Sequence, residues 1–265
     1  MSSKLIPSNP EEVMVIRKIT PVLTTLSVPF LRFGRIKIGG RGTIVRLQNG
    51  SLAVFSPVAL TDSVHQTLRE LGEVKYITAL DQEHHIFVES WHKAFPEARV
   101  IGPDTLPKKN PSRFSVLFPA KGKENVKVDE AFDREFDYEY VDAHPNLELV
   151  FCHKPSKTLI EADLLFNLPA TEQMSKTGES PTSGLLTGFF CSLNNTNGSA
   201  IWQKRFIWYL LSARNRTGFN KSMARIDKFD FDRIVPCHGD VIETGGKGIF
   251  RKVMEWHLAA ARKAQ

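Results

Sequence analysis

One acidic residue interrupts a markedly apolar stretch of the chain. Asp163 stands between Ala162 and the Leu-Leu-Phe run 164–166, and residues 157–162 before it have the pattern of a strand. A carboxylate in such a position is costly to bury unless it is paired or bound to a metal. Any fold of this chain therefore has to bring a counter-charge or a cation to Asp163.

Strand and helix patterns alternate in both halves of the 265 residues. The Asn49-Gly50 pair predicts a hairpin turn, and Thr61 or Asp62 and Gly72 have the positions of a helix cap and stop. Residues 103–135 are expected to hold little structure, and 169–184 to be polar and mobile. Strands are predicted at 35–38, 43–47, 52–55, 74–78, 99–101, 136–142, 147–152 and 157–162, and helices at 63–71, up to Phe95, 201–213 and 247–263. This alternation favours a layered α/β architecture.

The bulk composition places few limits on function. The three cysteines, at 152, 191 and 237, are odd in number and dispersed, which argues against a disulfide framework. A polar N-terminal stretch and the absence of any long apolar run predict a cytoplasmic protein outside membranes. The net charge is +6, and the lysines and arginines are scattered along the chain in runs no longer than adjacent pairs. This distribution is typical of a solvated surface, and attraction of anionic substrates is the alternative.

Four of the eight histidines fall where a predicted strand ends in a loop: His84, His85, His153 and His238. Such loops gather functional groups, and imidazole with carboxylate suits zinc, iron or manganese. The other histidines are expected to pack or to lie on the surface, and His144, in an Ala-His-Pro turn, is interpreted as structural.

Three segments, in the right order, resemble motifs of the metallo-β-lactamase superfamily. His153-Lys-Pro-Ser resembles its His-Thr-Pro-Gly corner, Ala162-Asp-Leu-Leu-Phe166 its Gly-Asp-Leu-Leu-Phe strand end, and Val235-Pro-Cys-His-Gly239 its Val-Pro-Gly-His-Gly loop. The resemblance covers about residues 35–260. It implies a four-layer αββα sandwich, in a single domain 1–265 with a variable cap or lid near 169–230, and a metal bound by Asp163.

The family's His-x-His-x-Asp-His motif is altered to Leu80-Asp-Gln-Glu-His-His85. In one frame His84 is the final histidine and Asp81 replaces the second; in the other His85 is the final histidine. The first frame is preferred because it keeps more groups able to bind a metal. The expected ligands are therefore Asp81, His84, His85, His153, Asp163 and His238, with His85 either a ligand or a residue that orients one. They would hold one or two zinc ions, and iron or manganese is also allowed.

The resemblance is closest to an uncharacterised branch, so it implies the fold more firmly than an activity. It implies hydrolysis by metal-bound hydroxide, with Asp163 and Asp81 as catalytic residues. The narrowest hypothesis is a lactonase for a small apolar or anionic ester. Four alternatives stay open: a glyoxalase II-like thioesterase, a phosphodiesterase or nuclease, an inactive relic of the fold, and redox chemistry at iron. Nucleic acid is not an expected partner. The sequence does not predict the oligomeric state.

Two further groups of residues bear on the substrate and on the ligands. The segment 169–213, with Trp202 and Trp208, is expected to shape an apolar substrate site or to pack as an ordinary helix, and a phosphate site would need Lys108, Lys109 and Arg113. Cys152 and Cys237 each precede a proposed ligand, but strand alternation favours placing their thiols in the core.

Overall fold

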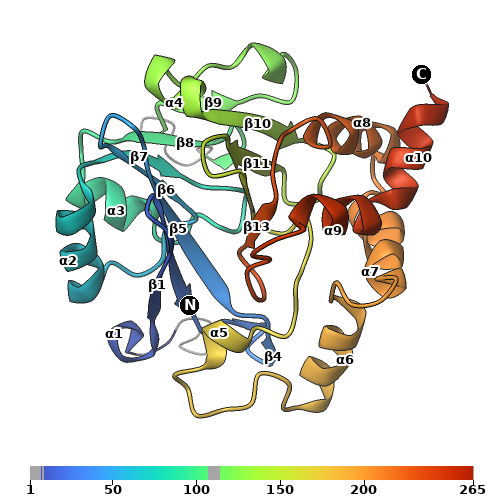
Figure 1. Ribbon diagram of the computed structural model, residues 1–265, viewed down its shortest axis with the longest axis horizontal. Coiled ribbons are helices and arrows are strands. Elements are labelled where there is room, and N and C mark those ends of the chain that lie inside the picture. Colours follow the sequence, from blue (N-terminus) through green and yellow to red (C-terminus); the bar gives the residue numbers. More distant parts are fainter. Residues whose placement is uncertain (1–6, 8, 107–113, 265) are drawn as a thin grey trace.

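Two β-sheets form the centre of the molecule, with helices on both outer sides (Figure 1). The computed structural model describes residues 7, 9–106 and 114–264. Lys108, Lys109 and Arg113, the residues that come nearest to a phosphate-binding cluster in the sequence and are expected in a solvated loop, lie outside the described residues. No helix in the described part is long and apolar enough to cross a membrane.

The larger sheet is antiparallel at one side and parallel at the other. Its strand order is β1 (Val15–Thr20), β2 (Leu23–Val28), β5 (Gly40–Arg46), β6 (Leu52–Phe55), β7 (Val74–Thr78), β8 (Arg99–Pro103) and β9 (Val116–Phe118). The smaller sheet has the order β10 (Phe136–Val141), β11 (Glu148–His153), β12 (Thr158–Glu161) and β13 (Arg233–Pro236), and its last pair is parallel. A short hairpin, β3 (Leu31–Arg32) and β4 (Ile36–Lys37), stands apart.

Three apolar clusters hold the layers together. Phe55 and Ile101 of the larger sheet share one cluster with Phe151 and Ile160 of the smaller sheet, so the two sheets pack face to face. Period-two alternation sends neighbouring side chains to opposite faces of a strand. Ile44 accordingly packs outward in a second cluster with helices α2 (Asp62–Leu71) and α3 (Val88–Ala94).

The third cluster covers the outer face of the smaller sheet. Its helices are α7 (Ile201–Phe206), the π-helical turn η4 (Ile207–Leu211), α8 (Arg216–Ile226), α9 (Gly246–Val253) and α10 (Glu255–Lys263). Phe219, Met223 and Phe250 from these helices pack with Val150 and Ile234 of the sheet. The order of layers is therefore helix, sheet, sheet, helix, which confirms the predicted α/β sandwich.

Local signals placed several elements correctly. The Thr61 side chain caps α2 by accepting from the Val64 amide, and Gly72 ends that helix. The Asn49-Gly50 turn joins β5 to β6 as predicted, with Gly50 at a φ of +85° that favours glycine.

Other elements differ from the prediction. Residues 103–135, expected to be irregular, contain β9, a 3-10 turn at Lys123–Asn125 and α4 (Glu130–Glu135), whose Phe132 lies in the central core. The helix predicted at 247–263 is interrupted at Met254, because both halves bury a face in the same cluster.

The segment near 169–230 serves two different purposes. Its second half supplies α7 and α8 to the outer helical layer, whereas α5 (Thr171–Met174) and α6 (Leu185–Leu193) lie beside the β3–β4 hairpin (Figure 1). A single domain with a cap stays a prediction.

Candidate metal centre

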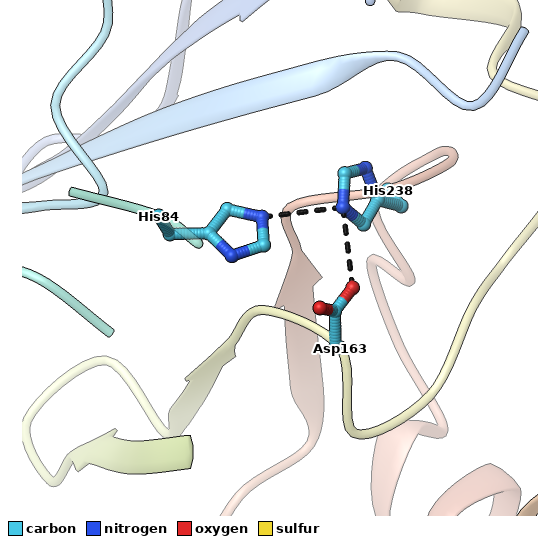
Figure 2. Close-up of side chains that lie close together, drawn as sticks. All are labelled: His84, Asp163 and His238. Carbon is cyan, nitrogen blue, oxygen red and sulfur yellow. Dashed lines mark hydrogen bonds and ion pairs between the residues drawn. The ribbon is translucent and has the colours of Figure 1, made fainter. Parts of the chain in front are cut away.

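Three side chains from three separate loops converge at one edge of the sandwich. His84 follows β7 of the larger sheet, Asp163 follows β12 and His238 follows β13. Because β12 and β13 are parallel neighbours, their carboxyl ends lie at the same edge. The Nε2 atom of His238 is 3.2 Å from His84 Nε2 and 3.2 Å from Asp163 Oδ1 (Figure 2). One ligand atom from each residue lies within 4.8 Å of the other two.

The carboxylate of Asp81 orients the His84 ring. This fully buried group accepts from the backbone amides of Glu83 and His84, both at 2.7 Å, and lies 2.9 Å from His84 Nδ1. An ionised carboxylate only accepts hydrogen bonds, so His84 Nδ1 carries the proton. The Nε2 lone pair of the neutral ring therefore faces His238.

A backbone carbonyl orients the His238 ring in the same way. The carbonyl oxygen of Gly39 lies 2.7 Å from His238 Nδ1. A carbonyl cannot donate, so this nitrogen also carries a proton. Phe166 stacks on the ring with an interplanar angle of 9°. His238 Nε2 lies 3.2 Å from both His84 Nε2 and Asp163 Oδ1, so it can bind a cation that these two atoms share, or carry a second proton that it donates to Asp163.

Asp163 is held by a rigid frame of hydrogen bonds. Asn146 Nδ2 donates to its Oδ2 at 2.6 Å, which leaves Oδ1 for His238. The Glu148 carboxylate accepts from the Ala162 and Asp163 amides, and Glu161 accepts from the Leu164 amide at 2.9 Å. These bonds explain how the chain turns sharply after β12 with a carboxylate inside.

The electrostatics of the centre favour a positive charge. Burial opposes protonation of His84, but the charge and hydrogen bond of Asp81, with the charges of Asp163 and Glu83, raise its pKa to about 9. Burial opposes ionisation of Asp163, but the His238 hydrogen bond and the nearby histidine charges hold its pKa well below the usual range. Burial, together with the negative charge of the neighbouring Glu161 carboxylate, raises the pKa of Glu148 well above its usual value.

The structure corrects the expectation for His153. Its ring lies 2.7 Å from Ser156 Oγ and 3.3 Å from Glu135 Oε2, away from the three converging side chains. His153 pairs with Thr158 at the start of β12, and Asp163 lies five residues further on, a separation of about 16 Å along an extended chain. The two residues therefore lie at opposite ends of the hairpin. His85 is exposed and outside the group.

His144, interpreted from the sequence as structural, is buried in the turn after β10 and lies outside the three converging side chains. Its Nδ1 accepts from the Asn146 amide, and its Nε2 has no hydrogen-bond partner among the described residues. Burial lowers its pKa, while the charges of Asp163 and Asp81 act in the opposite direction.

The donor set suits a transition metal. Two imidazoles and one carboxylate match both the three protein ligands of catalytic zinc sites and the two-histidine, one-carboxylate set of non-haem iron. Cys152 and Cys237 do not join them, because both thiols lie in apolar clusters. Burial raises the pKa of Cys237 well above its usual value.

A pocket opens beside the centre, and both His84 and His238 line it. Its other walls come from the β2–β3 connection, the segment after β6, the loop before α3 and the N-terminal segment. Phe30, Val58 and Phe87 are among these walls. The segment 169–213, expected to shape the substrate site, contributes nothing to this pocket among the described residues, and Trp202 is exposed.

Comparisons with known proteins agree with this architecture. A family model described as a domain of unknown function (DUF4336) matches residues 33–187, more than half of the chain. No curated protein matches. The DIM-1 metallo-β-lactamase exposed to ceftazidime superposes with a TM-score of 0.56 at 12% identity, covering 95% of this chain and 98% of that one. A metallo-β-lactamase from Pontibacter korlensis gives 0.55 at 9%, covering 92% and 98%.

Flavodiiron proteins have a similar fold over part of their length. The Flv1 flavodiiron core from Synechocystis sp. PCC6803 gives a TM-score of 0.61 at 13% identity, covering 92% of this chain and 60% of that one. Structural matches at such low sequence identity show that the fold is shared, and they carry no information about activity. The chain belongs to the DUF4336 family, and its fold is that of the metallo-β-lactamase superfamily.

Proposed function

We propose that this protein is a metal-dependent hydrolase of ester-like bonds whose cation is held by His84, Asp163 and His238. The observation that carries the proposal is the pair of Nε2 atoms facing each other at 3.2 Å while both Nδ1 atoms lie against oxygen acceptors. A cation between the rings would satisfy both lone pairs and the Asp163 carboxylate at once.

Each residue around the cation has a distinct task. A divalent ion held there supplies Lewis acidity for activating water and polarising a substrate oxygen. His84, His238 and Asp163 Oδ1 would hold it, and Asp163 would also orient water. Asp81 acts through His84, so it is a positioning residue rather than a group that touches the substrate. Asn146 keeps Asp163 turned toward the centre.

Lactone hydrolysis is the narrowest form of this proposal, and thioester hydrolysis is its close alternative. Both need a carbonyl beside the cation and an apolar pocket for the rest of the substrate. Phosphodiester cleavage has less support, since the described lining of the pocket offers no unpaired cationic side chain for a second phosphate oxygen.

An inactive relic of the fold is the second candidate, and one observation favours it. The raised pKa of His84, about 9, allows a proton to occupy the space between the rings at neutral pH. A protein in that state would have the same geometry without a metal.

Metal titration separates the two candidates. Metal-free protein should bind one equivalent of Zn²⁺, Fe²⁺ or Mn²⁺ in calorimetry, and His238→Ala and Asp163→Ala should weaken binding by more than about 100-fold, beyond the usual effect of residues outside the ligand set. His85→Ala, at an exposed position, and His153→Ala are the controls and should keep the stoichiometry. Absence of binding by the wild-type protein would favour the relic. A screen of lactones, thioesters and phosphodiesters with the loaded protein then tests the bond cleaved.

A further inference from the structure

The pocket beside the metal centre has apolar walls. Pro29, Phe30, Val58, Ile86 and Phe87 line it. Two of these, Ile86 and Phe87, belong to the same loop as His84, which also lines the pocket, so the pocket continues the candidate metal centre. A substrate whose reacting group lies at the imidazoles would place its remaining part against these side chains.

Away from the imidazoles, the two guanidinium groups that line the pocket, those of Arg32 and Arg41, already have carboxylate partners in Glu83 and Glu172. Arg32 donates both terminal nitrogens to the carboxylate of Glu83, and the Arg32 Nη2–Glu83 Oε1 distance is 3.0 Å. The guanidinium of Arg41 is buried and donates to the carbonyls of Pro236 and Gly239. An anionic substrate arm would lose hydration here without gaining a free counter-charge, which is costly.

The size of the space limits the arm further. The cavity volume is about 90 Å³, below the roughly 150 Å³ of an apolar cavity that accepts benzene. The walls of this open pocket can enclose a short aliphatic chain, whereas part of an aromatic ring or of a long acyl chain would extend beyond them into solvent.

We infer that this pocket binds the neutral, short aliphatic arm of the ester. The inference rests on the proposed function for the identity of the reacting group. From the sequence, the segment 169–213 was expected to shape the substrate site, whereas the side chains that would contact this arm belong to the first ninety residues. The substrate expected from the sequence was apolar or anionic, and the pocket disfavours an anionic arm.

Binding to metal-free protein tests the pocket without any catalysis. Protein with labelled isoleucine and valine methyl groups is titrated with three amides and followed by NMR. N-methylbutyramide has a neutral aliphatic arm, N-methylsuccinamate has an arm that ends in a carboxylate, and N-methylbenzamide has an aromatic ring. N-methylbutyramide should shift the methyl signals of Val28, Val58 and Ile86 in a saturable way, at least tenfold more tightly than the other two compounds. Equal or tighter binding of N-methylsuccinamate or of N-methylbenzamide, or no shift with N-methylbutyramide, would overturn the inference.

Two variants make the test specific. Ala59→Leu places three more carbons in the pocket and should weaken amide binding at least tenfold, whereas Ala94→Leu, on the exposed end of α3, should leave it unchanged. Glu83→Gln removes the charge that neutralises Arg32 and should improve binding of N-methylsuccinamate at least fivefold.

The two proposals can fail separately. Amide binding in a protein that takes up no metal would leave the pocket intact and refute the hydrolase. Metal binding in a protein that does not bind the amide would support the metal site and refute the inference about the pocket.

Discussion

Each imidazole of the candidate metal centre has its Nδ1 atom held by an oxygen behind the ring. For His84 that oxygen is a carboxylate, and for His238 it is a carbonyl. The difference matters because a carboxylate adds a full negative charge, which favours the protonated ring. His84 is therefore the residue at which a proton and a metal compete.

Asp81→Asn tests this competition at the level of one residue. The amide keeps the size of the side chain and removes its charge, so the pKa of His84 in metal-free protein should fall from about 9 to its ordinary 6.5 or below. Ring-nitrogen NMR over a pH series measures it directly. Asp62→Asn, on an exposed residue of α2, is the control, and an unchanged pKa in Asp81→Asn would contradict the assignment.

The same shift predicts a change of stability with pH. Because the folded pKa of His84 is raised, its contribution is fully present below about pH 6.5 and is lost as the pH rises through about 9, a difference of about 3 kcal/mol. Metal-free wild-type protein should lose this contribution between pH 6 and pH 9.5 in urea unfolding. The Asp81→Asn variant should lose little of it.

At the scale of elements, β5 and the loop after β13 are joined by one buried arginine. Arg41 donates to the carbonyls of Pro236 and Gly239, on either side of His238, at 2.6 and 2.7 Å. Gln173 of α5 donates to the Cys237 carbonyl between them at 2.8 Å. The loop that carries His238 is thus held by side chains from two other elements.

Arg41→Met is expected to release this loop. Loss of two charge-assisted hydrogen bonds to buried carbonyls should cost about 3 kcal/mol of unfolding free energy and weaken metal binding by 10- to 100-fold. Urea unfolding and metal titration measure the two effects. Arg46→Met, on an exposed arginine at the end of the same strand, should change stability by less than about 1 kcal/mol. Similar losses in both variants would refute the role of Arg41.

At the scale of the whole molecule, the metal centre bridges two sheets. His84 comes from a loop of the larger sheet, whereas Asp163 and His238 come from the smaller one (Figure 1). Their relative position therefore depends on the core between the sheets. Phe151 lies at the middle of that core, with its ring 5.0 Å from that of Phe55 and edge-on to Phe132.

Phe151→Ala should weaken the packing of one sheet on the other. Truncating a buried phenylalanine to alanine lowers the free energy of unfolding by about 3–5 kcal/mol. Metal affinity should fall as well, because His84 on one sheet would no longer be held at a fixed position relative to Asp163 and His238 on the other. Thermal unfolding with and without Zn²⁺ measures both. Phe189→Ala, on a side chain that is 65% exposed, is the control and should leave both quantities unchanged.

Short-range patterns in the sequence determined much of the fold, and the family resemblance placed all three residues of the candidate centre within a longer set of expected ligands. The cap at Thr61 and the turn at Gly50 depend on local backbone chemistry, so a single sequence was enough to predict them. The acid at position 163 predicted a partner for the same reason, since burying a lone carboxylate is unfavourable wherever it occurs. The expected αββα layers followed from a family resemblance, and the shared clusters confirm them.

Tertiary structure alone decided which histidines reach Asp163. Both His153 and His144 lie near a strand end, but the β11–β12 hairpin carries His153 to the far end, where Glu135 lies beside it. Which end of a hairpin a residue occupies depends on the register of pairing, and register is set by long-range contacts. The role of Arg41 and the lining of the pocket could not be predicted from the sequence either. The carbonyl that Arg41 binds is 195 residues away, and the pocket walls come from separate segments that only the packing of the sheets brings together.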